Sequence, residues 1–187
     1  VALNLSETQN RRARELNRAA GLDGRIEVID GNFEDIVQPD GTFDVVWCQD
    51  SILHSNQKPR VFQEVHRVLR PSGHFIFTDP MQAEGVPAER LRPVLARIHL
   101  EEMGSFPSYR RLAAEIGFQV ADVEDLSPML PRHYARVKDE LEKHREALLA
   151  ACSQSYLDAM TRGLDHWVDA GRAGHLAWGI LHFRKAN

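Results

Sequence analysis

Short apolar runs alternate with amphipathic segments along the first half of the chain. Four runs have the length and composition of strands, at residues 1–5, 26–30, 43–48 and 74–79. Helices are predicted at residues 6–20, where Ser6 and Gln9 form a capping box and Gly21 follows, and at residues 58–69. Repeated strand-helix units of this kind predict right-handed crossovers and a parallel sheet, with the chain folded as an α/β domain.

The second half of the chain is richer in helix. Helices are expected at residues 88–103 and 109–116, and strands at 118–125 and 175–184. A charged amphipathic region runs from Arg132 to about Ala170, with a break expected near residues 152–155. We interpret the whole chain, 1–187, as one partial domain in which residues 128–174 form a helical lid or insertion. The alternative for that region is a packed helix with a solvated face.

Composition and charge limit the classes of protein and of binding partner that fit this chain. The chain has 187 residues, of which 43% are hydrophobic and 27% charged, as in one soluble globular domain. A formal net charge of -4 without charged blocks favours a small-molecule partner over nucleic acid or an anionic membrane. Neither a membrane-spanning run nor a leader is found, so a cytoplasmic protein is expected. The two cysteines lack metal-like spacing, so no metal site is predicted, and a homo-oligomer stays open.

Polar residues follow two neighbouring predicted strands. One stretch reads FDVVWCQDSILH, from Phe43 to His54, and the other reads VLRPSGHFIFTDPM, from Val68 to Met81. In a parallel sheet the carboxyl ends of the strands form the edge where ligands bind. The sequence therefore predicts a binding cleft after these two strands.

Several of these segments resemble S-adenosylmethionine-dependent methyltransferases of the seven-stranded Rossmann-like kind. The general resemblance rests on NLS, GNFEDI, FDVVWCQD and LRPSGHFIFTD. A narrower resemblance, to the sarcosine and dimethylglycine N-methyltransferases that make glycine betaine, rests on QDSILHS, FTDPMQ, GSFPSYR, LPRHYARV and GLDHWVDAGRAGHLAWGILHF. It implies an α/β Rossmann-like methyltransferase fold: a mostly parallel sheet, helices on both faces and a helical lid insertion. The implied cofactor is S-adenosyl-L-methionine.

The chain departs from that family at its start. The family's first strand and the glycine-rich turn that cradles the methionine part of the cofactor are not present in this sequence. We expect both to lie upstream of Val1, with residues 1–5 as the family's second strand. The fragment alone is therefore expected to bind the cofactor poorly and to be inactive.

The resemblance assigns six residues to the cofactor. In the family, a polar side chain after the second strand takes the ribose hydroxyls, a loop after the third strand meets the adenine, and the fourth strand passes beneath the methionine part. The matching residues are Asn4, Leu5, Asn32, Phe33, Gln49 and Asp50. For Asn4 and Asn32 a local backbone or turn role stays open.

The acceptor side needs different chemistry. The carboxylate of the acceptor is bound by a cation or by several hydrogen-bond donors, and the quaternary ammonium of the product is bound by the faces of aromatic rings. The candidate substrate-binding residues are Asp79, Pro80, Met81, Tyr109, His133, Tyr134, Arg136 and Trp178. His54 is the candidate catalytic residue, because it or water can take the proton that leaves sarcosine. Surface arginines and core aromatics are the alternative for most of this set.

Three functions fit these observations. The first is methyl transfer from S-adenosylmethionine to the amine of sarcosine or dimethylglycine, giving glycine betaine. The second is methyl transfer to another small acceptor, such as a sterol, a quinone or phosphoethanolamine, because fold does not fix substrate. The third is a catalytically silent, truncated Rossmann-like binding domain. The exact acceptor, the number of methylations and the oligomeric state are not determined by the sequence.

Overall fold

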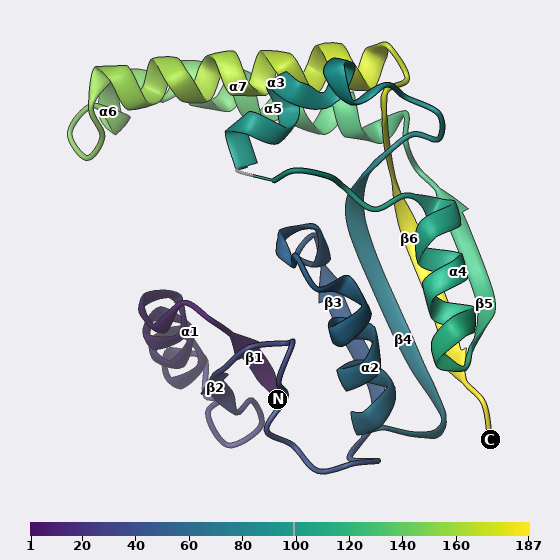
Figure 1. The fold of residues 1–187 in the computed structure, drawn as a ribbon. Coiled ribbons are helices and arrows are strands. Elements are labelled where there is room, and N and C mark those ends of the chain that lie inside the picture. The colour runs from purple at the N-terminus through teal and green to yellow at the C-terminus, as the bar shows by residue number, and fades with distance from the viewer. Residues whose placement is uncertain (99) are drawn as a thin grey trace.

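The computed structural model describes residues 1–98 and 100–187 (Figure 1). Strands and helices alternate through α2, and helices dominate from α3 to α7. In chain order the elements are β1 (Ala2–Asn4), α1 (Glu7–Ala19), β2 (Val28–Asp30), β3 (Phe43–Gln49), the 3₁₀ helix η1 (Ile52–His54), α2 (Lys58–Val68), β4 (Leu69–Gln82), α3 (Ala88–Ile98), α4 (Phe106–Ile116), β5 (Phe118–Asp125), α5 (Met129–Lys143), α6 (Arg145–Leu148), α7 (Gln154–Arg172) and β6 (Leu176–Lys185).

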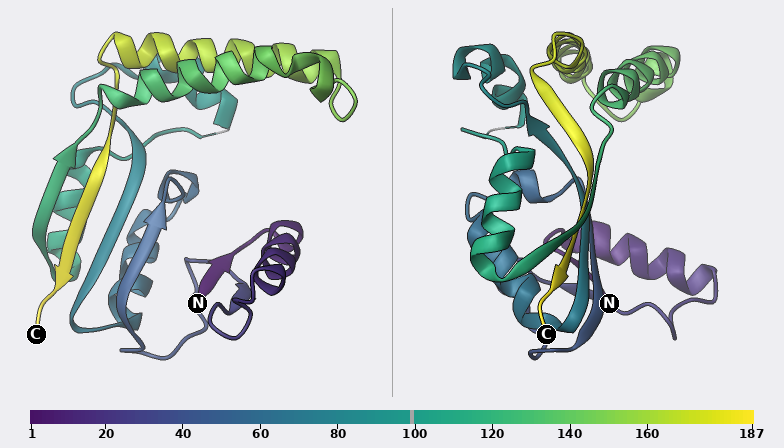
Figure 2. Two further views of the ribbon diagram at one scale, coloured as in Figure 1. Left: turned by 180° about the vertical axis from the view of Figure 1, so that it is seen from behind. Right: turned by 90° about the vertical axis from the view of Figure 1, so that its right-hand side faces the viewer.

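The strands form two separate sheets. β1 and β2 pair in parallel, and the larger sheet has the order β3-β4-β6-β5. β3 and β4 are parallel as predicted, whereas β6 runs antiparallel to both β4 and β5. In the right-hand view of Figure 2, α1 lies on the opposite side of the strands from α2 and α4. The fold is therefore α/β, and of the four strand pairs described, two are parallel and two, both involving β6, are antiparallel, so the larger sheet is mixed where a mostly parallel one was expected.

The main core lies between the larger sheet and helices α2 and α4. The ring of Phe62 on α2 is 5.3 Å from that of Phe75 and 5.8 Å from that of Tyr109 on α4. Aromatic pairs at these distances contribute stability beyond their buried area. Alternate residues of β3 face the other way, and there Trp47 is 63% exposed.

β1 and β3 do not pair, and a cavity of about 570 Å³ lies between them. We call it the strand-gap cavity; it is lined by residues of β1, the loop after β2, β3, η1 and α2. This interruption matches the expectation that the chain lacks one strand of its family.

The start of β4 corrects a predicted boundary. Pro71 and Gly73 suggested a loop before a strand at His74, but the strand begins at Leu69, directly after α2. Leu69 is fully buried, and the pairing of β3 with β4 shifts register after Phe43. A Cβ atom at residue 73 would stand 2.9 Å from the carbonyl oxygen of Arg70, so glycine permits the close backbone approach at this irregularity.

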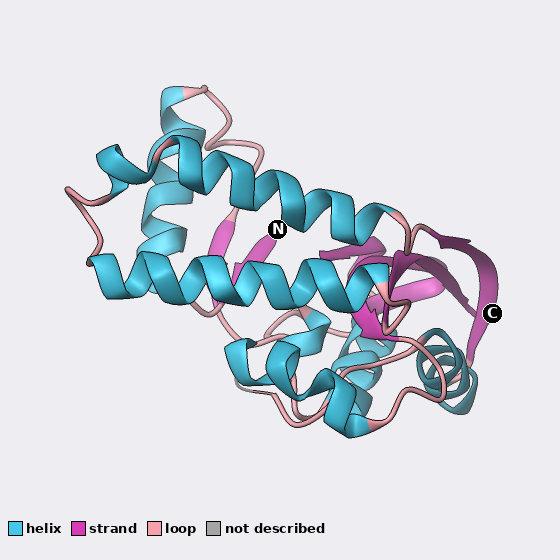
Figure 3. Cartoon of the chain, turned by 90° about the horizontal axis from the view of Figure 1, so that it is seen from above, coloured by secondary structure: helices cyan, strands magenta, loops and turns pink. Residues whose placement is uncertain are grey.

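Helices α3, α5 and α7 form a layer beyond the end of the larger sheet (Figures 1 and 3). They share a second apolar cluster that includes Leu91, Leu130 and Trp167. α3 ends at Ile98, before the predicted end of that helix; residue 99 lies outside the described residues, and residues 100–104 are not helical. The expected break in the long helical region occurs at residues 149–153. Of this layer, α5 and α7 belong to residues 128–174, whose role as a lid stays a prediction, and α3 lies outside them.

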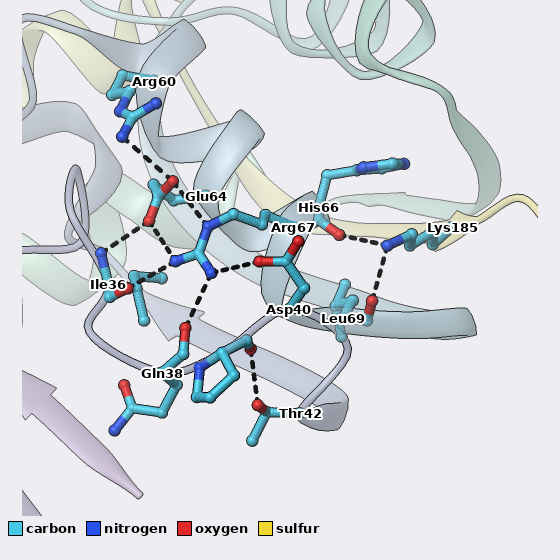
Figure 4. A network of polar contacts seen from close by, with 11 residues as sticks. Ile36, Gln38, Asp40, Thr42, Arg60, Glu64, His66, Arg67, Leu69 and Lys185 are labelled. Atoms are coloured by element: carbon cyan, nitrogen blue, oxygen red, sulfur yellow. Dashed lines mark hydrogen bonds and ion pairs between the residues drawn. The ribbon is translucent and has the colours of Figure 1, made fainter.

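Arg67 on α2 fixes the loop between β2 and β3 (Figure 4). Its guanidinium donates to the carbonyl oxygens of Ile36 and Gln38 at 2.6 and 2.9 Å, and pairs with Glu64 at 2.7 Å and Asp40 at 2.9 Å. The Glu64 carboxylate also accepts the backbone N–H of Ile36. The loop that carries Phe33 is thus held to α2 by a charged network.

Candidate active site

Four of the six residues assigned to the cofactor line the strand-gap cavity: Asn4, Leu5, Phe33 and Gln49. Asn4 ends β1, and its side-chain amide donates to Gln9 at 3.0 Å. Leu5 is 67% exposed, and Phe33 packs against the main core. Polar and apolar groups from three separate segments therefore meet around the gap between β1 and β3.

The Asn32 side chain forms a hydrogen bond within its own loop. Its side-chain oxygen accepts the backbone N–H of Glu34 at 2.9 Å, and the residue does not line the cavity. This arrangement is an Asx turn, which shapes the loop beside Phe33.

Asp50 lies at the turn after β3. Its backbone has φ of 48°, in the left-handed region that is uncommon for residues other than glycine, and its N–H donates to the carbonyl of Thr78 at 2.9 Å. One carboxylate oxygen accepts the indole N–H of Trp178 at 2.9 Å. Strained backbone of this kind recurs at functional sites.

A second cavity of about 720 Å³, which we call the lid cavity, lies between this turn and helices α3, α5 and α7. It receives Asp50, Pro80, Tyr134 and the exposed ring of His54. The rings of Tyr134 and Trp167 meet in its wall, with centroids 4.6 Å apart. Asp50 thus lines the lid cavity together with candidate acceptor residues, while its chain neighbours Gln49 and Ser51 line the strand-gap cavity.

Several lining residues of the lid cavity were not predicted from the sequence. They come from α3 and from one face of α7 and include Arg97, Tyr156, Met160, Arg162, Gly163 and His166. Residues 156, 159, 160, 163, 166 and 167 follow the spacing of one helix face. The helical spacing of these residues could be seen in the sequence. It does not show whether the face that they form lines a cavity.

Six of the predicted acceptor residues line neither large cavity. They are Asp79, Met81, Tyr109, His133, Arg136 and Trp178. The first three are buried at the base of the site. His133 and Arg136 are on the outer side of α5, where the Arg136 side chain is 77% exposed and pairs with Glu140 at 3.2 Å.

Asp79 links three parts of the site. One carboxylate oxygen accepts the backbone N–H of Leu53 in η1 at 3.0 Å, and the other accepts the Tyr109 hydroxyl at 2.5 Å. Burial raises the pKa of Asp79 from 3.8 to about 7, although both hydrogen bonds lower it. Asp79 therefore positions η1, and with it His54, from beneath the cavity.

Asp79→Asn is expected to change the pH dependence of stability. The folded-state pKa lies above the unfolded value, so the folded wild type binds an extra proton between about pH 4 and 7 and its free energy of unfolding falls as pH rises through that range. An asparagine does not titrate, so the variant lacks this fall in the free energy of unfolding. Relative to wild type, the variant should gain on the order of 2 kcal/mol between pH 5 and 8 in urea unfolding.

Asp44→Asn, at an exposed position of β3, is the control and should follow the wild-type pH profile. Parallel profiles for wild type and Asp79→Asn would show that Asp79 does not titrate in this range.

Among residues 1–98 and 100–187, no three His, Cys, Asp or Glu side chains gather as a metal site would require. Within the same residues, no helix is both long and apolar enough to span a bilayer.

Comparison with known proteins identifies the family. A family profile described as "Methyltransferase domain" matches residues 1–77. The chain is 50% identical to the sarcosine/dimethylglycine N-methyltransferase of Halorhodospira halochloris and 48% identical to that of Aphanothece halophytica. These matches cover 99% and 98% of this chain and 66% of each relative, so the chain spans about two thirds of the relatives' length.

A solved structure agrees with these relatives. The crystal structure described as a sarcosine dimethylglycine methyltransferase from Galdieria sulphuraria superposes with a TM-score of 0.95 at 42% identity, over 98% of this chain and 68% of that one. The chain therefore belongs to the sarcosine/dimethylglycine N-methyltransferase family of S-adenosylmethionine-dependent methyltransferases.

Proposed function

We propose that this chain forms the acceptor site and one wall of the donor site of an enzyme that methylates the nitrogen of sarcosine or dimethylglycine, giving glycine betaine. The supporting observation is that identity of 42–50% to enzymes named for these acceptors extends over 98–99% of the chain, including α3, α5 and α7. A phosphoethanolamine N-methyltransferase of Triticum aestivum matches at 28% over 76% of the chain, and a sterol C-methyltransferase of Oryza sativa at 34% over 70%.

The strand-gap cavity fits one side of the methyl donor. Asn4 offers a side-chain oxygen toward ribose hydroxyls, and Leu5 and Phe33 offer apolar surface to the adenine. Gln49 lies beside the turn that leads into the lid cavity. S-adenosylmethionine supplies an electrophilic methyl group on a sulfonium. The residues named here would hold its nucleoside part, while backbone donors for its methionine carboxylate are absent from this set.

The lid cavity fits the acceptor. The new bond joins the acceptor nitrogen to the methyl carbon, and the carbon–sulfur bond that breaks leaves its electron pair on sulfur. Catalysis of such a displacement depends on alignment and exclusion of water. Asp50 and the ring of Tyr134, which both line this cavity, attract the cation that forms on nitrogen, and Trp178 holds Asp50 through its indole N–H. With sarcosine a proton then leaves nitrogen, and His54 is placed to accept it.

A methyl-transfer assay tests this function. The full-length natural protein should methylate dimethylglycine and sarcosine, with phosphoethanolamine as a control acceptor that is not used. The 187-residue chain assayed alone should show little turnover, because the strand-gap cavity offers only part of a donor site. Absence of turnover with glycine, sarcosine and dimethylglycine by the natural protein, or preference for phosphoethanolamine, would overturn the proposal.

A further inference from the structure

Arg97 is a half-buried cation whose partners are not acids. Its guanidinium carbon lies 6.0 Å from the centre of the Tyr134 ring, and one terminal nitrogen lies 3.1 Å from the sulfur of Met160. No carboxylate of the described residues lies within 4 Å of it. The comparably buried Arg67 and Arg145 each pair with two acids. Arg97 therefore keeps most of its donors available to the lid cavity.

Gly163 makes room for this side chain. A Cβ atom at residue 163 would stand 2.4 Å from Cδ and 2.8 Å from Nε of Arg97. Glycine inside a helix costs about 1 kcal/mol relative to alanine. The glycine lies in the middle of α7, where Arg97 crosses the helix. The path of Arg97 into the cavity is therefore built into the packing of α3 on α7.

The surroundings of Arg97 complete a site for a small zwitterion. The Tyr134 ring contacts the guanidinium and also packs against Trp167 at an interplanar angle of 45°. Asp50 supplies the negative charge of the same cavity and is held by Trp178. Tyr134 lines the same cavity as both charged residues, and its guanidinium partner Arg97 lies 6.0 Å from the ring centre.

We propose that Arg97 binds the carboxylate of the amino acid acceptor, with Gly163 and Tyr134 as the residues that position it. This inference rests on the proposed function, and it names the group that separates amino acid acceptors from amines without a carboxylate. The planar guanidinium binds a carboxylate through two parallel hydrogen bonds. Asp50 then lies toward the nitrogen end of the acceptor, where methyl transfer leaves a positive charge.

Arg97→Met tests the proposal in the full-length natural protein. The KM for dimethylglycine should rise about 30-fold with kcat changed by less than about threefold, because the lost interaction is present before and during the reaction. Turnover of dimethylethanolamine, which has a hydroxymethyl group in place of the carboxylate, should change by less than about threefold. Arg97→Lys should recover part of the loss, since it keeps the charge but not the fork.

Gly163→Ala is the second variant. It leaves Arg97 in the chain but displaces it, so the KM for dimethylglycine should also rise. Arg92→Met, on an exposed part of the same helix, is the matched control and should behave as wild type. Calorimetric binding of dimethylglycine to the S-adenosylhomocysteine complex gives a readout that does not need turnover.

The outcomes separate this inference from the function on which it rests. A wild type without methyl transfer to any of the amino acids refutes the proposed function. An active wild type whose Arg97→Met variant keeps the KM and affinity for dimethylglycine, or loses turnover equally with dimethylethanolamine, refutes the role of Arg97.

Discussion

Arg67→Met is expected to lower the free energy of unfolding by about 3 kcal/mol. The Glu64 side chain is only 4% exposed, and without Arg67 its carboxylate keeps just the Arg60 guanidinium at 3.3 Å and the N–H of Ile36. Two backbone carbonyls of the 31–42 loop also lose their donor. Leaving a buried charge without its main partner is among the most costly single changes in a protein.

Urea unfolding at neutral pH measures this effect. Arg70→Met is the matched control, because Arg70 pairs with Asp44 at 2.7 Å but both side chains are exposed, and the expected loss is at most about 1 kcal/mol. The double variant Arg67→Met/Glu64→Leu should recover part of the stability, since it removes the uncompensated charge. Equal losses for Arg67→Met and Arg70→Met would contradict the burial argument.

The same network predicts a pH dependence. The hydrogen bond from Arg67 holds the pKa of Glu64 below its ordinary value of 4.5. The stabilisation is therefore fully present above that value and is lost as pH falls through the lowered folded-state pKa. In Arg67→Met this part of the acid sensitivity should shrink, which unfolding curves between pH 3 and 6 detect.

Most helices and strands could be predicted from the pattern of neighbouring residues. Those that could not depend on contacts between residues far apart in the chain. The bounds of α1 and α2 were predicted closely, because caps and periodicity depend on a few neighbouring residues. Of the predicted capping box only one half forms: Ser6 accepts the N–H of Gln9, whereas the Gln9 side chain accepts from Asn4. The pairing of β6 with β4 was not predicted, since it joins residues such as His74 and Arg184 that are far apart in the chain. The antiparallel direction of β6 depends on where the chain returns after α7.

The site shows the same division. Asn4, Phe33 and Gln49 follow strands, so their place at one cavity could be expected from the order of the sheet. Arg97 could not be found this way, because its setting arises from three helices that pack side by side. Gly163 was the sequence clue: a glycine inside an amphipathic helix marks a close approach, but not what approaches.

Asp50→Asn is expected to lower kcat/KM for dimethylglycine about 100-fold in the full-length natural protein. Asp50 is the one acidic residue among the described residues that line the lid cavity. Methyl transfer leaves a positive charge on the acceptor nitrogen, and a fixed carboxylate in the same cavity stabilises it. The substitution isolates this charge, because asparagine tolerates the left-handed backbone and its amide oxygen still accepts the Trp178 N–H.

Two comparisons decide how the loss is interpreted. Asp44→Asn, at the other end of β3, should keep wild-type kinetics, and Trp178→Phe should lose less than Asp50→Asn because the carboxylate stays. Affinity for S-adenosylhomocysteine should change by less than about threefold in Asp50→Asn, because Asp50 faces the lid cavity and the thioether carries no charge. A weakened affinity with unchanged kcat would instead place Asp50 on the donor side, as its position after β3 first suggested.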